Sequence, residues 1–154
     1  MKHLTLIAAT ATATALAATG FADSHEEMPG EIVARHGQMQ IMALNLGVIG
    51  NMARGNTDYD ADAAQAAADN LVAISGVSQD LLWPDSTSDH PASHALPTVW
   101  TDRDGFFAAW DDFGEGAAQL QAVAGDGMDA MRAGLGAVGR TCGGCHDDYR
   151  MSDD

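Results

Sequence analysis

Residues 128–150 read MDAMRAGLGAVGRTCGGCHDDYR and place an apolar or sulfur-containing side chain at every third or fourth position. That spacing is the period of one face of an α-helix. A Gly-Asp-Gly break at 125–127 precedes the run and marks where the helix begins. The sequence therefore predicts a long amphipathic helix, and both cysteines continue its core-facing stripe. The stripe consists of Met128, Met131, Leu135, Val138, Cys142, Cys145 and Tyr149.

The two cysteines are followed directly by a histidine, which gives the pattern Cys-x-x-Cys-His. This is an attachment sequence for c-type haem. Residues three apart on a helix lie about one turn from each other, so the thiols of Cys142 and Cys145 can bond to the two vinyl groups along one porphyrin edge. The imidazole of His146 can then reach the iron from one side of the ring. We expect one covalently bound haem c with His146 as an axial ligand.

Three other uses of these cysteines compete with haem attachment. A thioredoxin-like redox pair belongs in a strand-helix-strand context, and no strands are evident in the sequence. A zinc site could use Cys142, Cys145 and His146 with a distant histidine such as His94, although structural sites usually pair two separate ligand clusters. A simple disulfide would close a very small loop for little gain and leaves the adjacent histidine unexplained.

Three further helices follow from apolar periodicity, and no alternating stretch is long enough to propose a sheet. The first runs from about Pro29 to Arg54, the second begins after Thr57, whose side chain can cap it with Asp60 three residues on, and the third runs from about Asp102 to Val123. The proline-rich stretch 83–101 predicts a long ordered loop between the second and third helices. We therefore expect an all-α, antiparallel four-helix bundle with up-down-up-down topology. The predicted core stripes are Arg35, Met39, Met42, Leu46, Ile49 and Ala53; Ala64, Ala67, Leu71 and Ile74; and Phe106, Trp110, Phe113, Ala117 and Leu120.

From 35 to 150 the chain resembles the cytochrome c′ family, the class II c-type cytochromes, including its low-spin relatives in which a methionine binds the iron. The matching segments are 142–150, Pro97-Thr-Val-Trp100, and the first helix from Arg35-His36 to the Gly-Asn-Met-Ala-Arg-Gly run at 50–55. The resemblance implies a four-helix bundle with one covalent haem. It also implies dimers, as in cytochrome c′ itself, or monomers, as among many low-spin relatives.

The resemblance also implies roles for individual side chains around the haem. Arg35 matches an arginine that contacts a haem propionate, whereas the neighbouring His36 stands where cytochrome c′ commonly has glutamine. Tyr149 and Arg150 match residues on the proximal side, near the iron-bound histidine. Met39 occupies the position that faces the iron on the distal side, where low-spin relatives use methionine as the second axial ligand. Met42, Met52, Met128 and Met131 are expected to pack the core instead.

The first 22 residues are typical of a signal peptide. Lys2 precedes an uncharged run of Leu, Ile, Ala and Thr, and small residues stand at the positions expected for cleavage after Ala22. This leaves residues 23–154 as one haem-binding domain in the periplasm. That part has no other long apolar run, so no membrane insertion is expected after cleavage.

The net charge of the chain limits the kinds of partner that it can bind. Seven Lys and Arg against 22 Asp and Glu give a formal net charge of −15. Such a surface repels nucleic acid and favours a redox partner with a basic patch. The alanine-rich face at 64–68 could pack within the bundle or against a second copy, so a homodimer is also open.

The sequence predicts an electron carrier rather than an enzyme. It contains no serine nucleophile with a base, no paired carboxylates in an evident cleft and no phosphate loop. The alternative is a high-spin, five-coordinate cytochrome c′ that binds nitric oxide or similar small gases at an open distal face. A third reading is a structural bundle whose cysteines stay free or form a disulfide.

Overall fold

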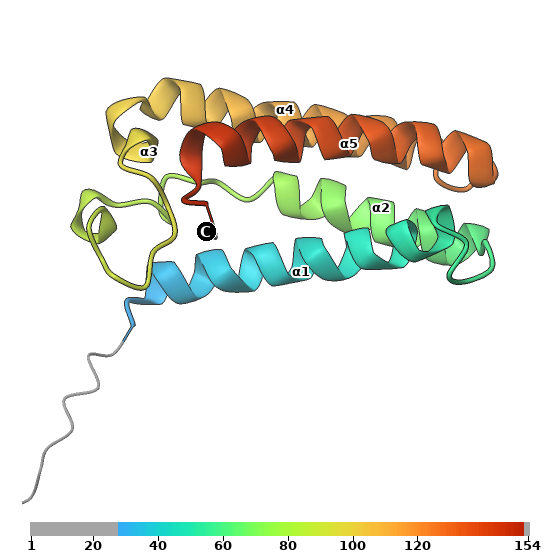
Figure 1. Ribbon diagram of the computed structural model, residues 1–154, viewed down its shortest axis with the longest axis horizontal. Coiled ribbons are helices and arrows are strands. Elements are labelled where there is room, and N and C mark those ends of the chain that lie inside the picture. The colour runs from blue at the N-terminus through green and yellow to red at the C-terminus, as the bar shows by residue number, and fades with distance from the viewer. Residues whose placement is uncertain (1–27, 153–154) are drawn as a thin grey trace, which may run out of the picture.

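The computed structural model describes residues 28–152, and this part of the chain contains four long helices that run alternately up and down (Figure 1). It confirms the predicted all-α bundle. The signal peptide expected at 1–22, with its cleavage site at Ala22, lies outside the described residues. The long helices are α1 (Gly30–Ala53), α2 (Ala61–Ser75), α4 (Arg103–Gln121) and α5 (Met128–Tyr149).

Aspartates begin two of these helices. Asp60 caps α2, since its side chain accepts a hydrogen bond from the Ala63 amide at 3.0 Å. The predicted cap at Thr57 is therefore wrong, because Thr57 lies in the preceding turn and the carboxylate is the group that reaches the free amides. Asp102 caps α4 in the same way through the Gly105 amide.

The connection from α2 to α4 contains two short helical segments that the sequence analysis assigned to a loop. These are η1 (Asp85–Thr87) and α3 (Thr98–Thr101). Each follows a proline directly, at Pro84 and Pro97. A proline suits the start of a helical turn because it has no amide hydrogen that needs a partner. The long connection remains, and it folds over one end of the bundle (Figure 1).

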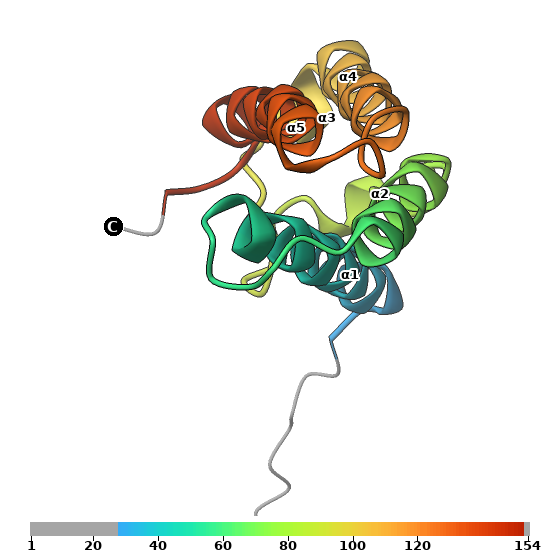
Figure 2. The ribbon, with the colours of Figure 1, turned by 90° about the vertical axis from the view of Figure 1, so that its right-hand side faces the viewer.

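The four long helices lie around a common space (Figure 2). Buried residues from all four form the core there, as the apolar stripes predict. Helices α4 and α5 approach closely at Gly134, where an added Cβ atom would lie 2.9 Å from the Cα atom of Leu120. Of the predicted core methionines, Met42, Met52 and Met131 are buried and Met128 packs against the same cluster from a half-buried position.

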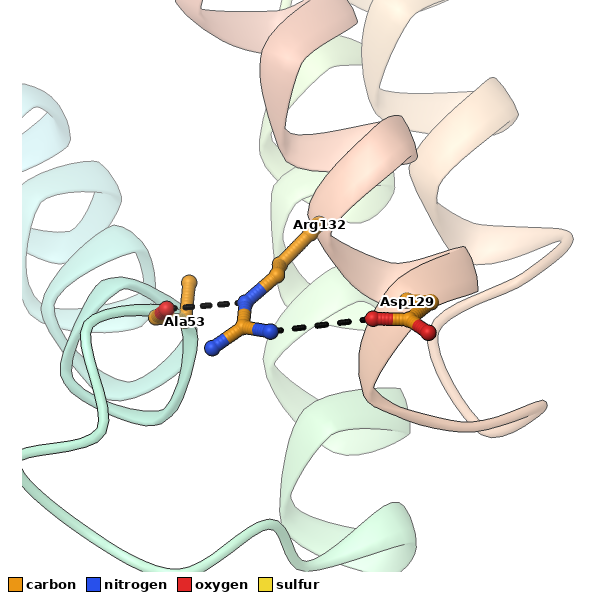
Figure 3. A network of polar contacts seen from close by, with 3 residues as sticks. All are labelled: Ala53, Asp129 and Arg132. Atoms are coloured by element: carbon orange, nitrogen blue, oxygen red, sulfur yellow. Dashed lines mark hydrogen bonds and ion pairs between the residues drawn. The ribbon is translucent and has the colours of Figure 1, made fainter.

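Polar contacts tie α5 to the end of α1, opposite the long connection. The Arg132 side chain donates to the carbonyl of Ala53 at 2.9 Å and forms an ion pair with Asp129 at 3.6 Å (Figure 3). This supplies a partner to a carbonyl at the C-terminal end of α1. Nearby, the Tyr59 hydroxyl donates to the Ala124 carbonyl at 2.8 Å and accepts from the Gly127 amide.

Between residues 28 and 152, no helix is both long enough and apolar enough to cross a membrane.

Candidate functional site

A cavity of about 390 Å³ lies between one face of α1 and the last turns of α5. All eight residues that the sequence analysis singled out line it, although they come from opposite ends of the chain. From α1 these are Arg35, His36 and Met39, and from the end of the chain Cys142, Cys145, His146, Tyr149 and Arg150. The remaining wall consists of Ile32, Met42, Ala43, Leu46, Trp83, Ser93, His94, Ala95 and Phe106.

Both thiols of the Cys-x-x-Cys pair are free and half-buried at this cavity. Burial raises the pKa of the Cys142 thiol, and burial together with the charges of Cys142 and Asp148 raises that of Cys145. Both groups therefore stay protonated at neutral pH. Across residues 28–152, no three His, Cys, Asp or Glu side chains gather to hold a metal ion. A zinc ion bound by Cys142, Cys145 and His146 would therefore lack a fourth ligand in the part of the chain that the structure describes.

Arg35 is buried, with only 4 % of its surface exposed. Its guanidinium donates to the Leu82 carbonyl and the Thr87 hydroxyl, and its Cζ atom lies 4.0 Å from the centroid of the Trp83 ring. Burial lowers the pKa of Arg35 to about 10, against the opposing effect of Glu31. The Nη1 donor has no partner among the residues described. A buried donor without a partner is costly, so an acceptor placed beside Nη1 would stabilise Arg35, most strongly if it were anionic.

Met39 differs from the other methionines of the helical stripes. Its side chain is 39 % exposed and lines the cavity, whereas Met42, one turn further along α1, is 8 % exposed and belongs to the packed core cluster. Met39 is therefore available to a group in the cavity. The neighbouring His36 also lines the cavity from an exposed position.

The long connection contributes cavity residues for which the sequence offered little signal. The backbone at 94–96 pairs with the end of α5, where the Met151 amide donates to the His94 carbonyl and the Leu96 amide to the Tyr149 carbonyl, both at 2.9 Å. This pairing brings His94 and Ala95 to the cavity. From the sequence His94 is only a candidate zinc ligand, and the Pro97-Thr-Val-Trp100 match is the one hint that this segment approaches the site.

Aromatic rings make much of the remaining wall. Phe106 lies between Trp83 and Tyr149, with ring centroids 4.9 and 5.4 Å away and the rings edge to face. All three residues line the cavity. The cavity is thus mostly apolar, with thiols and an imidazole on one side, a thioether on the other and unsatisfied positive charge at Arg35. This donor set fits a flat apolar macrocycle that carries a metal and carboxylates.

The fold and the site together define a haem-binding helical bundle of the c type. The family model described as Cytochrome C' matches residues 30–150. A cytochrome c-554 of Cereibacter sphaeroides is 40 % identical over 124 residues, which is 79 % of this chain and 93 % of that protein. A cytochrome c' of the same species is 37 % identical over 141 residues, covering 90 % of this chain and 95 % of the relative.

A solved structure agrees with these relatives. The cytochrome c' from Rhodobacter Spheriodes superimposes with a TM-score of 0.76 at 37 % identity, over 79 % of this chain and 95 % of that one. The chain therefore belongs to the cytochrome c′ family. It is a c-type haem cytochrome, and proteins of this family carry one covalently attached haem c.

Proposed function

We propose that this chain carries single electrons as a periplasmic monohaem cytochrome. Its haem is attached through Cys142 and Cys145, and its iron is bound by His146 and Met39. The observation that carries this proposal is the convergence of two thiols, an imidazole and a thioether on one apolar cavity. When bound, haem supplies an iron that exchanges one electron reversibly.

The cavity residues hold and tune that group. When haem is bound, Cys142 and Cys145 would hold it to α5, and His146 from the same helix and Met39 from α1 would be the ligands of its iron; all four line the cavity. A thioether favours the reduced iron, and closing both axial positions limits the structural change on electron transfer. Leu46 and Phe106 are apolar parts of the wall and would contact the bound group.

The polar residues of the cavity are proposed to contact the haem propionates and the side of the haem that faces His146. Arg35 offers its unpartnered Nη1 donor to a propionate, and His36 stands beside it on α1. Tyr149 and Arg150 support the side of the haem on which His146 lies. Because these groups hold the cofactor rather than a substrate, the proposed role is electron transfer and not catalysis.

The proposed location is the periplasm, reached by means of a signal peptide cleaved near Ala22, which leaves residues 23–154. The proposed redox partner carries a basic patch, since the chain has a formal net charge of −15. Electron exchange with such a partner should slow as salt screens the attraction.

A second copy of the chain is the other proposed partner, and the exposed face of α1 is the surface for it. Val33, Ile41 and Leu44 lie on this face, and Leu44 is 69 % exposed. From 37 to 53, α1 has no charged residue. Two copies of the mature chain, which has lost Lys2 and carries a formal net charge of −16, repel each other, so an uncharged apolar face is where they can meet. One solved cytochrome c' is described by its ligand-controlled dimer dissociation.

We expect Leu44→Glu to shift the protein from dimer to monomer in sedimentation velocity, because it adds charge to each side of the contact. Gln119→Glu adds the same charge at an exposed position on α4 and should leave the dimer intact. A wild-type protein that stays monomeric at every concentration tested would disprove the dimer, leaving electron transfer untouched.

The proposed function is tested on the exported, purified protein. Its optical spectra should be those of a low-spin c-type haem in both oxidation states, and a redox titration should follow a reversible one-electron curve. A high-spin, five-coordinate spectrum with ready binding of nitric oxide would instead support the gas-binding alternative. A protein without haem absorption would overturn both.

A further inference from the structure

The end of α5 is tied to the start of α4 by one carboxylate. The Tyr149 hydroxyl donates to Oδ2 of Asp102 at 2.8 Å. The other oxygen of Asp102, Oδ1, accepts the amide of Gly105 at 3.3 Å and so caps α4. The two helices share this acceptor, although its two partners are 44 positions apart in sequence. A movement of the last turn of α5 would therefore break a contact with the cap of α4.

Gly105 makes this arrangement sterically feasible. An added Cβ atom at Gly105 would lie 2.3 Å from Oδ2 of Asp102 and 2.6 Å from the Tyr149 hydroxyl oxygen. Any side chain at 105 would thus push the two partners apart, because such distances are far below van der Waals contact. The absence of a side chain at 105 is what lets the tyrosine hydroxyl reach the carboxylate.

Tyr149 is held at three points. Its ring packs edge to face on Phe106 with centroids 5.4 Å apart, its carbonyl accepts the Leu96 amide at 2.9 Å, and its hydroxyl is bound by Asp102. The hydrogen bond to Asp102, followed by burial, raises the pKa of Tyr149 to about 12. The hydroxyl therefore remains a donor throughout the neutral range, and the contact does not vary with physiological pH.

His146 lies one turn before Tyr149 on the same helix, and its carbonyl accepts the Arg150 amide. From these contacts we infer that Asp102 and Tyr149 are positioning residues, which fix the last turn of α5 and thereby the orientation of the His146 imidazole toward the iron. This inference rests on the proposed role of His146 as axial ligand. Neither residue needs to touch the metal, because the effect passes through the helical turn.

The chain contains only two tyrosines, and the other one is a matched control. The Tyr59 hydroxyl also donates a hydrogen bond at 2.8 Å, to the Ala124 carbonyl, but at the opposite end of the bundle. Tyr149→Phe and Tyr59→Phe each remove one hydroxyl and keep the ring. Both variants should lower Tm of the holoprotein, since Tyr59→Phe loses two hydrogen bonds to backbone groups and Tyr149→Phe loses one to a carboxylate.

Two readouts separate positioning from general stabilisation. In Tyr149→Phe, amide hydrogen exchange at residues 148–150 should accelerate about fivefold, the factor that follows from loss of a typical hydrogen bond. The ferric electron paramagnetic resonance signal should broaden, because His146 then samples more orientations. Tyr59→Phe should change neither readout. If Tyr149→Phe leaves both as in the wild type, or if Tyr59→Phe changes them equally, the inference is wrong.

A second pair of variants keeps the test valid if Tyr149→Phe folds poorly. Asp102→Asn keeps one oxygen to accept the Gly105 amide, and its NH2 group can donate to the Tyr149 hydroxyl oxygen, so the two helices stay linked and the variant should resemble the wild type. Asp102→Ser retains the cap but is too short to reach Tyr149, and should reproduce the faster exchange and the broader signal. Equal behaviour of these two variants would also overturn the inference. Failure of the proposed function is distinguishable, since it would appear as a wild-type protein without haem or without an iron-bound histidine.

Discussion

The double variant Cys142→Ala, Cys145→Ala, exported like the wild type, is expected to carry no covalently attached haem. In the proposed attachment each thiol would provide one bond to the macrocycle, and both thiols line the cavity from α5. Without them, only axial ligation and apolar contacts remain to hold the group. Mass spectrometry under denaturing conditions should therefore report the bare polypeptide for the variant and a haem adduct for the wild type.

The single variants are the controls for this experiment. Cys142→Ala and Cys145→Ala should each keep one covalent bond and so retain a haem adduct at reduced yield. A haem adduct in the double variant would show that another residue makes the attachment. A different outcome is a wild-type chain that shows no adduct and has two thiols that react with an alkylating reagent. That result would contradict haem attachment and support the structural bundle with free cysteines.

The second large effect is expected from Met39→Leu. Leucine keeps the apolar volume but removes the sulfur that we propose as the distal ligand, so the ferric spectrum should change from low-spin to high-spin. The reduction potential should fall by on the order of 0.1 V, because a thioether stabilises the reduced iron. Optical spectra and a redox titration of the two proteins measure both changes.

Met42→Leu is the matched control. Met42 lies one turn from Met39 on α1 and also lines the cavity, but it is buried in the packed core. Its replacement should leave the spectrum unchanged. If Met42→Leu rather than Met39→Leu alters the spin state, the distal ligand is Met42. If wild type and Met39→Leu are both high-spin, no methionine binds the iron and the gas-binding alternative gains support.

Local patterns predicted the helices well, and they placed the cysteines and His146 on the last of them. Helix ends depend on neighbouring residues, and α5 begins where the Gly-Asp-Gly break places it. The Cys-x-x-Cys-His spacing lies within two turns of one helix, so its geometry follows from the helical rise and period alone. The cap of α2 was assigned wrongly to Thr57, because two nearby polar residues could serve and only the backbone path selects Asp60.

The sequence by itself determined an all-helical chain with the Cys-x-x-Cys-His pattern on its last helix, because both properties arise from interactions within a few residues. Only the tertiary structure decided that Arg35 is buried against Trp83 with a donor left over, that Met39 borders the cavity rather than the core, and that Asp102 meets Tyr149. These contacts join segments some 47 or more residues apart, or depend on what fills the space between helices, and no local spacing specifies them.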